Sequence, residues 1–502
     1  MKKYFFLFLG LSVLFMSCSD DDGIKNGPSP DPDPTADVAA QDFMWKAMNL
    51  WYFWQADVPD LADDRFSTNA EYTAFLENNS NPENFYYSIC NRHEEIYGEE
   101  TAIDRFSFAN EDYTELVNSL SGISQSNGLE FRLSYIGNTN DVFGYVLYVW
   151  PDSDASTKDI QRGDFFTRVD GIQLTDSNYI NLLFGDNSTY TLGMATVENN
   201  TISDSAKEVS LSKIENQVED PILIAETLDV NGTKVAYLMY NRFLSSFNED
   251  LNNVFAKFKA DGATELVLDM RYNPGGNVNT SRLLASMVYG TNTEEVYIRQ
   301  RWNSKVQSAF SDASLTDYFE SKTPANSPIN SLNLNRVFVI ATGDSASASE
   351  LVMNGLDPYI DVIHIGTTTR GKNEFSITLV DDPDHELPFL YSSSRESNIN
   401  PDNSWGLQPL VGRNENADGF YDYTSGLSPD IELSEDLTNL GVLGDVSEPL
   451  LARALQEITG ESAKIDFTVE MPAESFTSSR LHTPLKDNMF LDKPLPTNLE
   501  LE

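Results

Sequence analysis

The sequence predicts a multidomain α/β protein with an N-terminal helical region, a small β-rich domain and an α/β core. Its 502 residues exceed what one hydrophobic core ordinarily supports. Its apolar fraction of 40% is that of a globular protein. The spacing of the apolar residues changes twice along the chain, from helical spacing to strand-like alternation and then to strands followed by helices.

The charge and the missing motifs argue against a nucleic-acid partner, a metal and other cofactors. The formal net charge is −45 at pH 7, which repels polyanions, so no nucleic-acid partner is expected. The sequence has no His-Glu-x-x-His motif and no cysteine cluster, so it predicts no metal site and no other cofactor. It gives no indication of the oligomeric state.

The first residues are typical of a secretion signal, assigned to residues 1–17. Two lysines precede an apolar run over residues 4–16 that is short for a membrane span. The run ends at Ser17 and Cys18, which resemble the lipobox of bacterial lipoproteins. An ordinary signal peptide with an incidental cysteine is the alternative. The resemblance implies a lipid anchor at Cys18 on an exported, outer-membrane protein that faces the periplasm or the cell surface.

An acidic, proline-rich tether follows over residues 18–37. Its Ser-Asp-Asp-Asp start resembles the export tag of surface lipoproteins in Bacteroidetes, although a solvated acidic spacer would look the same. The interleaved prolines favour a stiff, extended segment. Cys90 is the only cysteine besides Cys18, so the mature protein can form no intrachain disulfide.

Residues 38–115 are predicted to form a helical domain. Aromatic residues recur near its start at roughly helical spacing, among them Phe43, Trp45 and Trp51. Such a face favours packing into a core, and a ligand platform is the less common alternative.

Residues 116–215 are predicted to form a β-domain, with strands over residues 129–135 and 142–149. Residues 160–174 then combine a Gly-Asp turn, an apolar strand, an Asp-Gly turn and a short strand. This order resembles the second half of a PDZ domain, although any small β-module with an Asp-Gly hairpin would share it. PDZ domains bind an extended peptide as an added strand.

Residues 216–460 are predicted to form the α/β core. Asn231-Gly232 is a strong hairpin signal, and strands and helices alternate after it. The expected strands cover residues 235–240, 266–270, 337–341 and 362–365, and the expected helices cover residues 247–258, 280–289 and 347–356. This alternation favours a largely parallel sheet with functional residues at the carboxyl ends of its strands. Residues 461–502 are weakly patterned and are predicted to be a peripheral tail.

Ser347 stands where a buried strand meets a helix. The connecting residues are small, which would let a substrate backbone approach the hydroxyl. Unpaired N–H groups and the positive end of the helix dipole would stabilise an oxyanion there. Taken alone, the Ser-Ala-Ser-Ala-Ser run would more often be a helix cap.

A second segment gives Ser347 a partner. Lys372 follows Gly371 after the next strand, and it lies 25 residues beyond Ser347. The pair resembles the S41 peptidases, the C-terminal processing (tail-specific) proteases, in which a Ser-Ala-Ser-Glu serine is followed 25 positions later by a Gly-Lys lysine. Residues 268–276 add Leu-Asp-Met-Arg-Tyr-Asn-Pro-Gly-Gly, which also resembles a motif of that family.

The resemblance implies an α/β protease core of the S41 (ClpP/crotonase-like) type and a serine endopeptidase that acts on proteins or peptides. It assigns Ser347 as nucleophile, Lys372 as general base, and the backbone N–H groups of Gly276 and Ala348 as the oxyanion hole. The PDZ-like module would bind substrate peptide. A free lysine has a pKa of about 10.4, so Lys372 can act as a base only if burial or nearby positive charge lowers its pKa. We therefore expect it to be buried beside Ser347.

One position departs from the family pattern. Many members carry a glutamine four residues after the lysine, where it orients the amine, and this chain has Ser376 there. A hydroxyl can accept a hydrogen bond from the amine, but with a shorter reach. The departure keeps open a second possibility, that the chain is an inactive peptide-binding lipoprotein on an S41 scaffold.

Two other assignments fit the residues less well. Residues 366–372 match the start of a phosphate-binding loop, but Asn373 stands where that motif needs Ser or Thr, and a strand is expected where it needs a helix. For a Ser-His-Asp hydrolase, no sequence feature places one of the four histidines (His93, His364, His385 and His482) beside Ser347.

Overall fold

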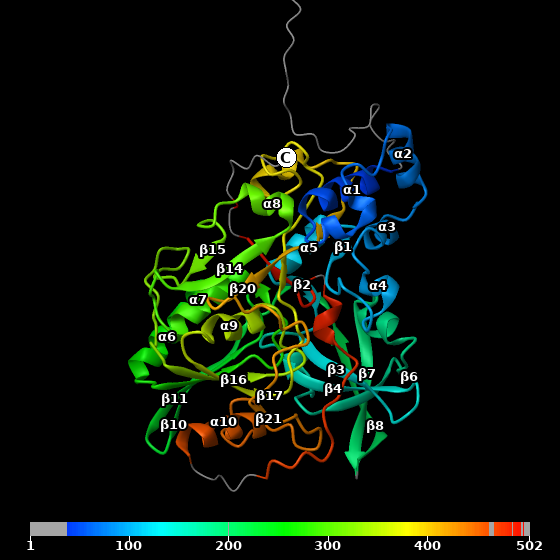
Figure 1. Ribbon diagram of the computed structural model, residues 1–502. Coiled ribbons are helices and arrows are strands. Elements are labelled where there is room, and N and C mark those ends of the chain that lie inside the picture. The colour runs from blue at the N-terminus through cyan, green and yellow to red at the C-terminus, as the bar shows by residue number, and fades with distance from the viewer. Residues whose placement is uncertain (1–37, 199, 461–465, 484, 493–494, 496–502) are drawn as a thin grey trace, which may run out of the picture.

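The computed structural model describes residues 38–198, 200–460, 466–483, 485–492 and 495 (Figure 1). The predicted signal peptide, Cys18 and the tether lie outside these residues. Within the described part of the chain, no helix is both long and apolar enough to cross a bilayer.

The N-terminal region is helical and packs on the core. Its helices are α1 (Ala39–Trp51), α2 (Asn69–Glu77), α3 (Pro82–Ser88), α4 (Glu94–Tyr97) and α5 (Tyr113–Leu120). The aromatic face of α1 is buried, as predicted for core packing, and the Trp51 indole donates to the Pro388 carbonyl at 2.8 Å. The region also contributes β1 (Phe108–Asn110), which pairs with β19 (Gly406–Gln408) of the core. The helical region and the core therefore share one continuous interface.

The β-rich domain is one largely antiparallel sheet with the order β22-β3-β4-β5-β7-β8, and β6 pairs with β5. Its strands are β3 (Leu129–Tyr135), β4 (Val142–Val149), β5 (Phe165–Val169), β6 (Ile172–Gln173), β7 (Thr189–Glu198), β8 (Thr201–Ser212) and β22 (Thr477–Ser478). The predicted strands at 129–135 and 142–149 are confirmed. The predicted Asp-Gly turn is confirmed as well, since Asp170 and Gly171 both have positive φ. A separate ladder joins β2 (Ile123–Ser126) to β9 (Ile214–Val218).

The core contains the predicted, largely parallel sheet, with the order β10-β11-β12-β16-β17-β21. Its strands are β10 (Ile222–Val230), β11 (Thr233–Tyr240), β12 (Glu265–Asp269), β16 (Arg336–Ala341), β17 (Asp361–Gly366) and β21 (Ile431–Glu432). Only β10 runs antiparallel to its neighbour, through the predicted Asn231-Gly232 hairpin.

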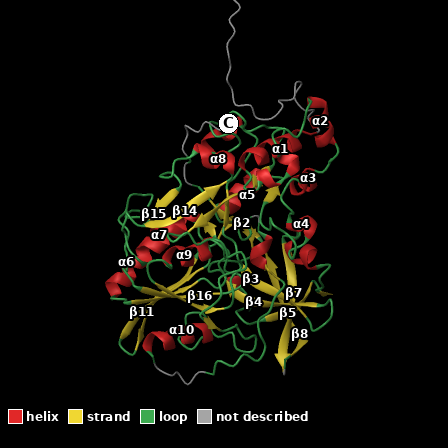
Figure 2. Cartoon of the chain, in the orientation of Figure 1, coloured by secondary structure: helices red, strands yellow, loops and turns green. Residues whose placement is uncertain are grey.

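Helices cover both faces of this sheet, which buries its continuous apolar strands. They are α6 (Asn248–Asp261), α7 (Val278–Val288), α9 (Ala348–Leu356) and α10 (Pro449–Thr459). Residues of α7 and α9 pack in one buried cluster and those of α10 in another, on opposite sides of the strands (Figure 2). The structure thus confirms the α/β core.

A second core sheet was not anticipated. It has the order β13-β23-β18-β20-β14-β15. Its strands are β13 (Gly276–Asn277), β14 (Val296–Trp302), β15 (Thr316–Tyr318), β18 (Glu374–Ser376), β20 (Leu410–Glu415) and β23 (Met489–Phe490), and α8 (Ser304–Ala309) follows β14. β13 follows the loop after β12, β18 follows the loop after β17, and both strands pair with β23. This sheet therefore brings the two loops close together.

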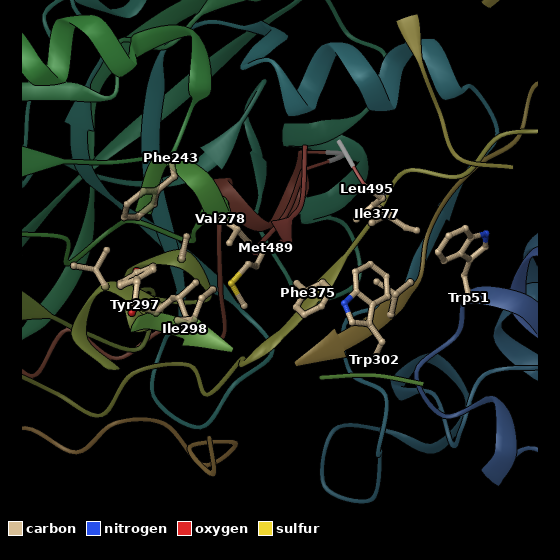
Figure 3. Packing of buried hydrophobic residues seen from close by; sticks show 14 of the residues in the cluster. Trp51, Phe243, Val278, Tyr297, Ile298, Trp302, Phe375, Ile377, Met489 and Leu495 are labelled. Atoms are coloured by element: carbon tan, nitrogen blue, oxygen red, sulfur yellow. The ribbon is translucent and has the colours of Figure 1, made fainter. Parts of the chain in front are cut away.

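The prediction of a peripheral C-terminal tail was wrong for the described residues. Beyond residue 465 the chain, shown in red in Figure 1, passes along β3 and then enters the core. Met489 is fully buried in the main hydrophobic cluster, beside Val278 and Phe375 in Figure 3. The error arose because β22 and β23 have two residues each, and strands this short leave no hydrophobic periodicity in the sequence.

Candidate active site

Ser347 lies at the tip of the turn between β16 and α9. Its φ of 60° is positive, a strained conformation for a residue with a Cβ, and backbone strain of this kind clusters at functional sites. Asn273 holds the turn from the facing loop, since its carbonyl accepts from the Ala346 amide at 3.1 Å and from the Ser349 hydroxyl at 2.9 Å. The loop after β12 therefore fixes the position of the serine.

Two glycines allow that loop to approach the serine. A Cβ on Gly275 would stand 2.4 Å from the Ser347 Cβ, and a Cβ on Gly276 would stand 2.3 Å from the Phe243 carbonyl oxygen. Both residues also have positive φ. Asn277 donates to Phe243 on one side of the strand, so the neighbouring N–H of Gly276 faces the other side, toward β23. Ala348 opens α9, where N–H groups have no partner within the helix.

Lys372 is fully buried, as expected for a lysine base. Burial lowers its pKa to about 8, although the carboxylates of Asp487, Glu374 and Asp104 act in the opposite direction. Its ammonium lies 4.6 Å from the centre of the Phe106 ring. Such an amine is partly neutral near physiological pH, which an exposed lysine is not.

Glu350 joins the serine segment to the lysine segment. Its carboxylate accepts from the amides of Ser347 at 2.8 Å, Gly371 at 2.7 Å and Lys372 at 2.9 Å, and from the Thr369 hydroxyl at 2.5 Å. Burial raises the pKa of Glu350 to about 7, while these hydrogen bonds favour the charged form. The sequence contained this glutamate within the Ser-Ala-Ser-Glu motif but gave no sign of its role.

Ser347 and Lys372 each hydrogen-bond to the C-terminal part of the chain and not to each other. The Ser347 hydroxyl donates to the Asp487 carbonyl at 2.7 Å, and the Lys372 amine donates to the Asn488 side-chain oxygen at 3.1 Å. Ser376 donates to that same oxygen at 2.9 Å, so it contacts the lysine only through Asn488. No sequence signal pointed to Asp487 or Asn488.

The four histidines have other surroundings. Three have these contacts: His93 with the Ser107 carbonyl at 2.7 Å, His364 with the Ala341 carbonyl at 3.2 Å, and His482 with the Phe184 ring at 4.0 Å between centres. The fourth, His385, accepts from the Leu387 amide at 2.8 Å. The segment after Lys372 forms strand β18 rather than a helix, which contradicts a phosphate-binding loop.

A cavity of about 400 Å³ opens beside the serine turn. Ala346, Arg370 and Asp487 line it next to the site, and residues 472–478 of the C-terminal part of the chain line it as well. This volume is in the range of ligand-binding pockets.

Two family models match the chain. Residues 234–384 match Peptidase family S41, and residues 39–108 match the Peptidase S41 N-terminal domain. The first match contains Ser347, Lys372, Gly276 and Ala348, and the second covers most of the N-terminal helical region.

Individual relatives agree with these matches. A carboxyl-terminal-processing protease of Picosynechococcus sp. is 25% identical over 268 residues, which cover 52% of this chain and 58% of that protein's length. A crystal structure of a putative S41 protease from Bacteroides fragilis superposes with a TM-score of 0.61 at 25% identity, covering 84% of this chain and 97% of the other. The curated relative is thus matched over little more than half its length, whereas the crystal structure is matched almost throughout.

Proposed function

The chain belongs to the S41 family of serine-type peptidases, and we propose that it cleaves protein or peptide substrates with Ser347 as nucleophile and Lys372 as general base. The observation that carries this proposal is the pairing of a strained serine at a helix start with a buried lysine of lowered pKa, both hydrogen-bonded to consecutive residues just before β23. Perturbed pKa values of this kind are typical of catalytic groups.

The proposed reaction follows from these positions. Neutral Lys372 takes the hydroxyl proton as the Ser347 oxygen attacks the scissile carbonyl carbon, and the carbonyl oxygen becomes an oxyanion. The N–H groups of Gly276 and Ala348 would stabilise that oxyanion. The lysine then gives its proton to the leaving amine, and water releases the acyl group from the serine.

The β-rich domain is proposed to bind substrate as a PDZ-like module. Its strand β3, whose outer edge pairs with the two-residue strand β22, lies beside a helical turn, Ile180–Phe184, and such a strand-and-helix groove suits an extended peptide. The groove would hold a substrate segment while a neighbouring segment reaches Ser347.

The test is cleavage of an unfolded reporter protein by the wild type, Ser347→Ala and Lys372→Ala. We expect cleavage by the wild type and a loss of at least about a thousandfold in both variants. Wild-type protein that binds unfolded chains but does not cleave them from pH 7 to pH 10 would support the alternative, an inactive peptide-binding protein on the same scaffold.

We also propose that Cys18 carries a lipid anchor in the outer membrane. This rests on the sequence resemblance alone. Metabolic labelling with an alkyne fatty acid should mark the wild type and leave Cys18→Ser unmarked, and protease treatment of intact cells would show whether the protein faces outward.

A further inference from the structure

The C-terminal segment, defined here as residues 476–483 and 485–491, contacts the β-rich domain first. β22 pairs antiparallel with the edge strand β3, with Thr477 opposite Leu133 and Ser478 opposite Arg132. The Phe476 amide donates to the Leu133 carbonyl at 3.1 Å. The segment therefore completes the edge at which an added peptide strand would bind.

Aromatic side chains fix the segment in this groove. Phe476 stacks on Tyr135 with 4.6 Å between ring centres, and it also contacts Tyr179 at 5.5 Å. His482 stacks on Phe184 at 4.0 Å. These contacts use both walls of the groove, since Tyr135 belongs to β3 while Phe184 belongs to the helical turn.

The same segment then fills a gap between two strands of the active site. β23 lies between β13, which carries Gly276, and β18, which carries Ser376, and it runs parallel to both. The Leu491 amide donates to the Ser376 carbonyl at 3.0 Å. While β23 is in place, both neighbouring strand edges are already paired, and a substrate strand has no backbone partners there.

The catalytic groups are occupied by this segment as well. Ser347 and Lys372 are both fully buried, and their hydrogen bonds go to Asp487 and Asn488. The Gly276 N–H faces β23. Nucleophile, base and one oxyanion-hole donor thus all contact consecutive residues of one extended peptide.

We propose that the C-terminal segment is an internal ligand of both peptide-binding sites, and that it keeps the free protein closed until a substrate displaces it. This inference rests on the proposed function, which identifies the strand gap as the substrate site. Because the segment is covalently attached, its effective concentration at the site is high, and an intermolecular substrate must compete with it.

The internal ligand also indicates what a substrate looks like. Asn488 places a small polar side chain against Lys372, and the next residue, Met489, enters an apolar site with Val278 and Phe375. Upstream, Phe476 fills an aromatic site in the groove. The expected ligand is an unstructured segment with an aromatic residue about a dozen positions before a small polar residue and an apolar one.

The segment has its own anchor between the two sites. Buried Arg480 donates to Glu219 at 2.9 Å and, from its other terminal nitrogen, to the Asn241 carbonyl. A desolvated, paired arginine favours one register of the segment over others. Release of the segment should therefore require more than the fraying of a chain end.

The first test opens the site in the full-length protein. Met489→Asp places a charge in the apolar site and should expel β23. Met471→Asp makes the same change upstream of both sites, where Met471 is half-buried against the other hydrophobic cluster. We expect a fluorophosphonate probe to label Ser347 at least ten times faster in Met489→Asp than in the wild type or Met471→Asp. Unchanged or slower labelling in a folded Met489→Asp variant would overturn the proposal, because the segment would then be neutral or part of the catalytic machinery.

A second test does not depend on catalysis. A fluorescent peptide with the sequence of residues 476–491 is titrated into Ser347→Ala, with or without Met489→Asp. We expect binding to the opened double variant only, and equal binding to both proteins, or none to a folded double variant, would overturn the proposal. If Ser347 is inert in every variant while the peptide still binds only the opened one, the closure stands and the peptidase proposal fails.

Discussion

Gly275 shows how one missing side chain positions Ser347, the proposed nucleophile. An added Cβ would stand 2.4 Å from the Ser347 Cβ at a φ of +111°, so Gly275→Ala must displace the serine turn. We expect kcat/KM to fall at least about a hundredfold, since displacements near 1 Å have that effect. Gly232→Ala is the matched control, because Gly232 also has positive φ but nothing within 4 Å. Equal activity of the two variants would contradict the close approach.

Lys372 should give the reaction its pH dependence. With a pKa of about 8 the amine is mostly protonated at pH 7, so kcat/KM should rise about tenfold per pH unit until it levels near pH 8. Measuring kcat/KM from pH 6 to pH 10 checks this. A flat profile would exclude Lys372 as the base.

Burial of the same lysine should lower the free energy of unfolding at neutral pH. Its folded pKa of about 8 lies below the ordinary lysine value of 10.5, so the charged form is disfavoured in the folded state by on the order of 3 kcal/mol. Stability should therefore rise as pH increases from about 8 to 10.5. Lys372→Met should abolish activity, remove this rise and leave the protein no less stable at pH 7 in urea unfolding. A Lys372→Met variant that is markedly less stable would indicate a structural role instead.

At the scale of elements, Glu350 connects the start of α9 to the loop that leads into β18. Glu350→Gln turns one of the two accepting oxygens into a donor. That donor faces the amides of Ser347 and Lys372 if it replaces one oxygen, and the Gly371 amide and Thr369 hydroxyl if it replaces the other. We expect a loss of about 2–4 kcal/mol in unfolding free energy and at least a tenfold lower kcat. Glu415→Gln, which breaks one partly exposed ion pair with Arg301, should cost under about 1 kcal/mol and leave kcat unchanged. If Glu350→Gln lowers stability but not kcat, the carboxylate supports the fold without positioning the site.

The length of an element decides whether it can be predicted from the sequence. Strands such as β11 and β16 and helices such as α7 and α9 are long and apolar enough to be recognised by their periodicity. Ser347 and Lys372 could be proposed as a catalytic pair because short motifs flank those elements. β13, β18 and β23 have two or three residues each, and the pairing of Gly276 with Met489 spans most of the core sequence. Such contacts leave no local pattern, so the role of Asn488 could not be predicted.

At the scale of the whole molecule, a buried ion cluster joins the β-rich domain to the core. Glu435 accepts from Arg162 at 2.7 Å, from Arg271 at 3.2 Å and from Tyr272 at 2.5 Å. Arg132 of β3 reaches the same carboxylate at 3.4 Å. The cluster lies next to the cavity beside the serine turn, so it sets how the β-rich domain sits against the α/β core.

This cluster should make the association of domain and core sensitive to acid. Burial alone would raise the pKa of Glu435, but Arg162, Arg271 and Arg132 together lower it to about 2. Because the folded pKa lies below the ordinary glutamate value of 4.5, the contribution of this cluster to stability is complete above pH 4.5 and is lost as pH falls toward 2. That loss is on the order of 3 kcal/mol. Glu435→Gln should lower the unfolding free energy by about 3–5 kcal/mol at pH 7, because it leaves three arginines partly uncompensated.

Urea unfolding from pH 7 to pH 2.5 tests this, with Glu457→Gln as the control for a carboxylate on the outer face of α10. The wild type and Glu457→Gln should lose stability together below pH 4.5, whereas Glu435→Gln should start lower and show a shallower decline. If Glu435→Gln declines as steeply as the wild type, other carboxylates control the acid response. If its decline is shallow but fluorophosphonate labelling of Ser347 at pH 7 is unchanged, the cluster holds the β-rich domain to the core and does not affect how the C-terminal segment covers Ser347.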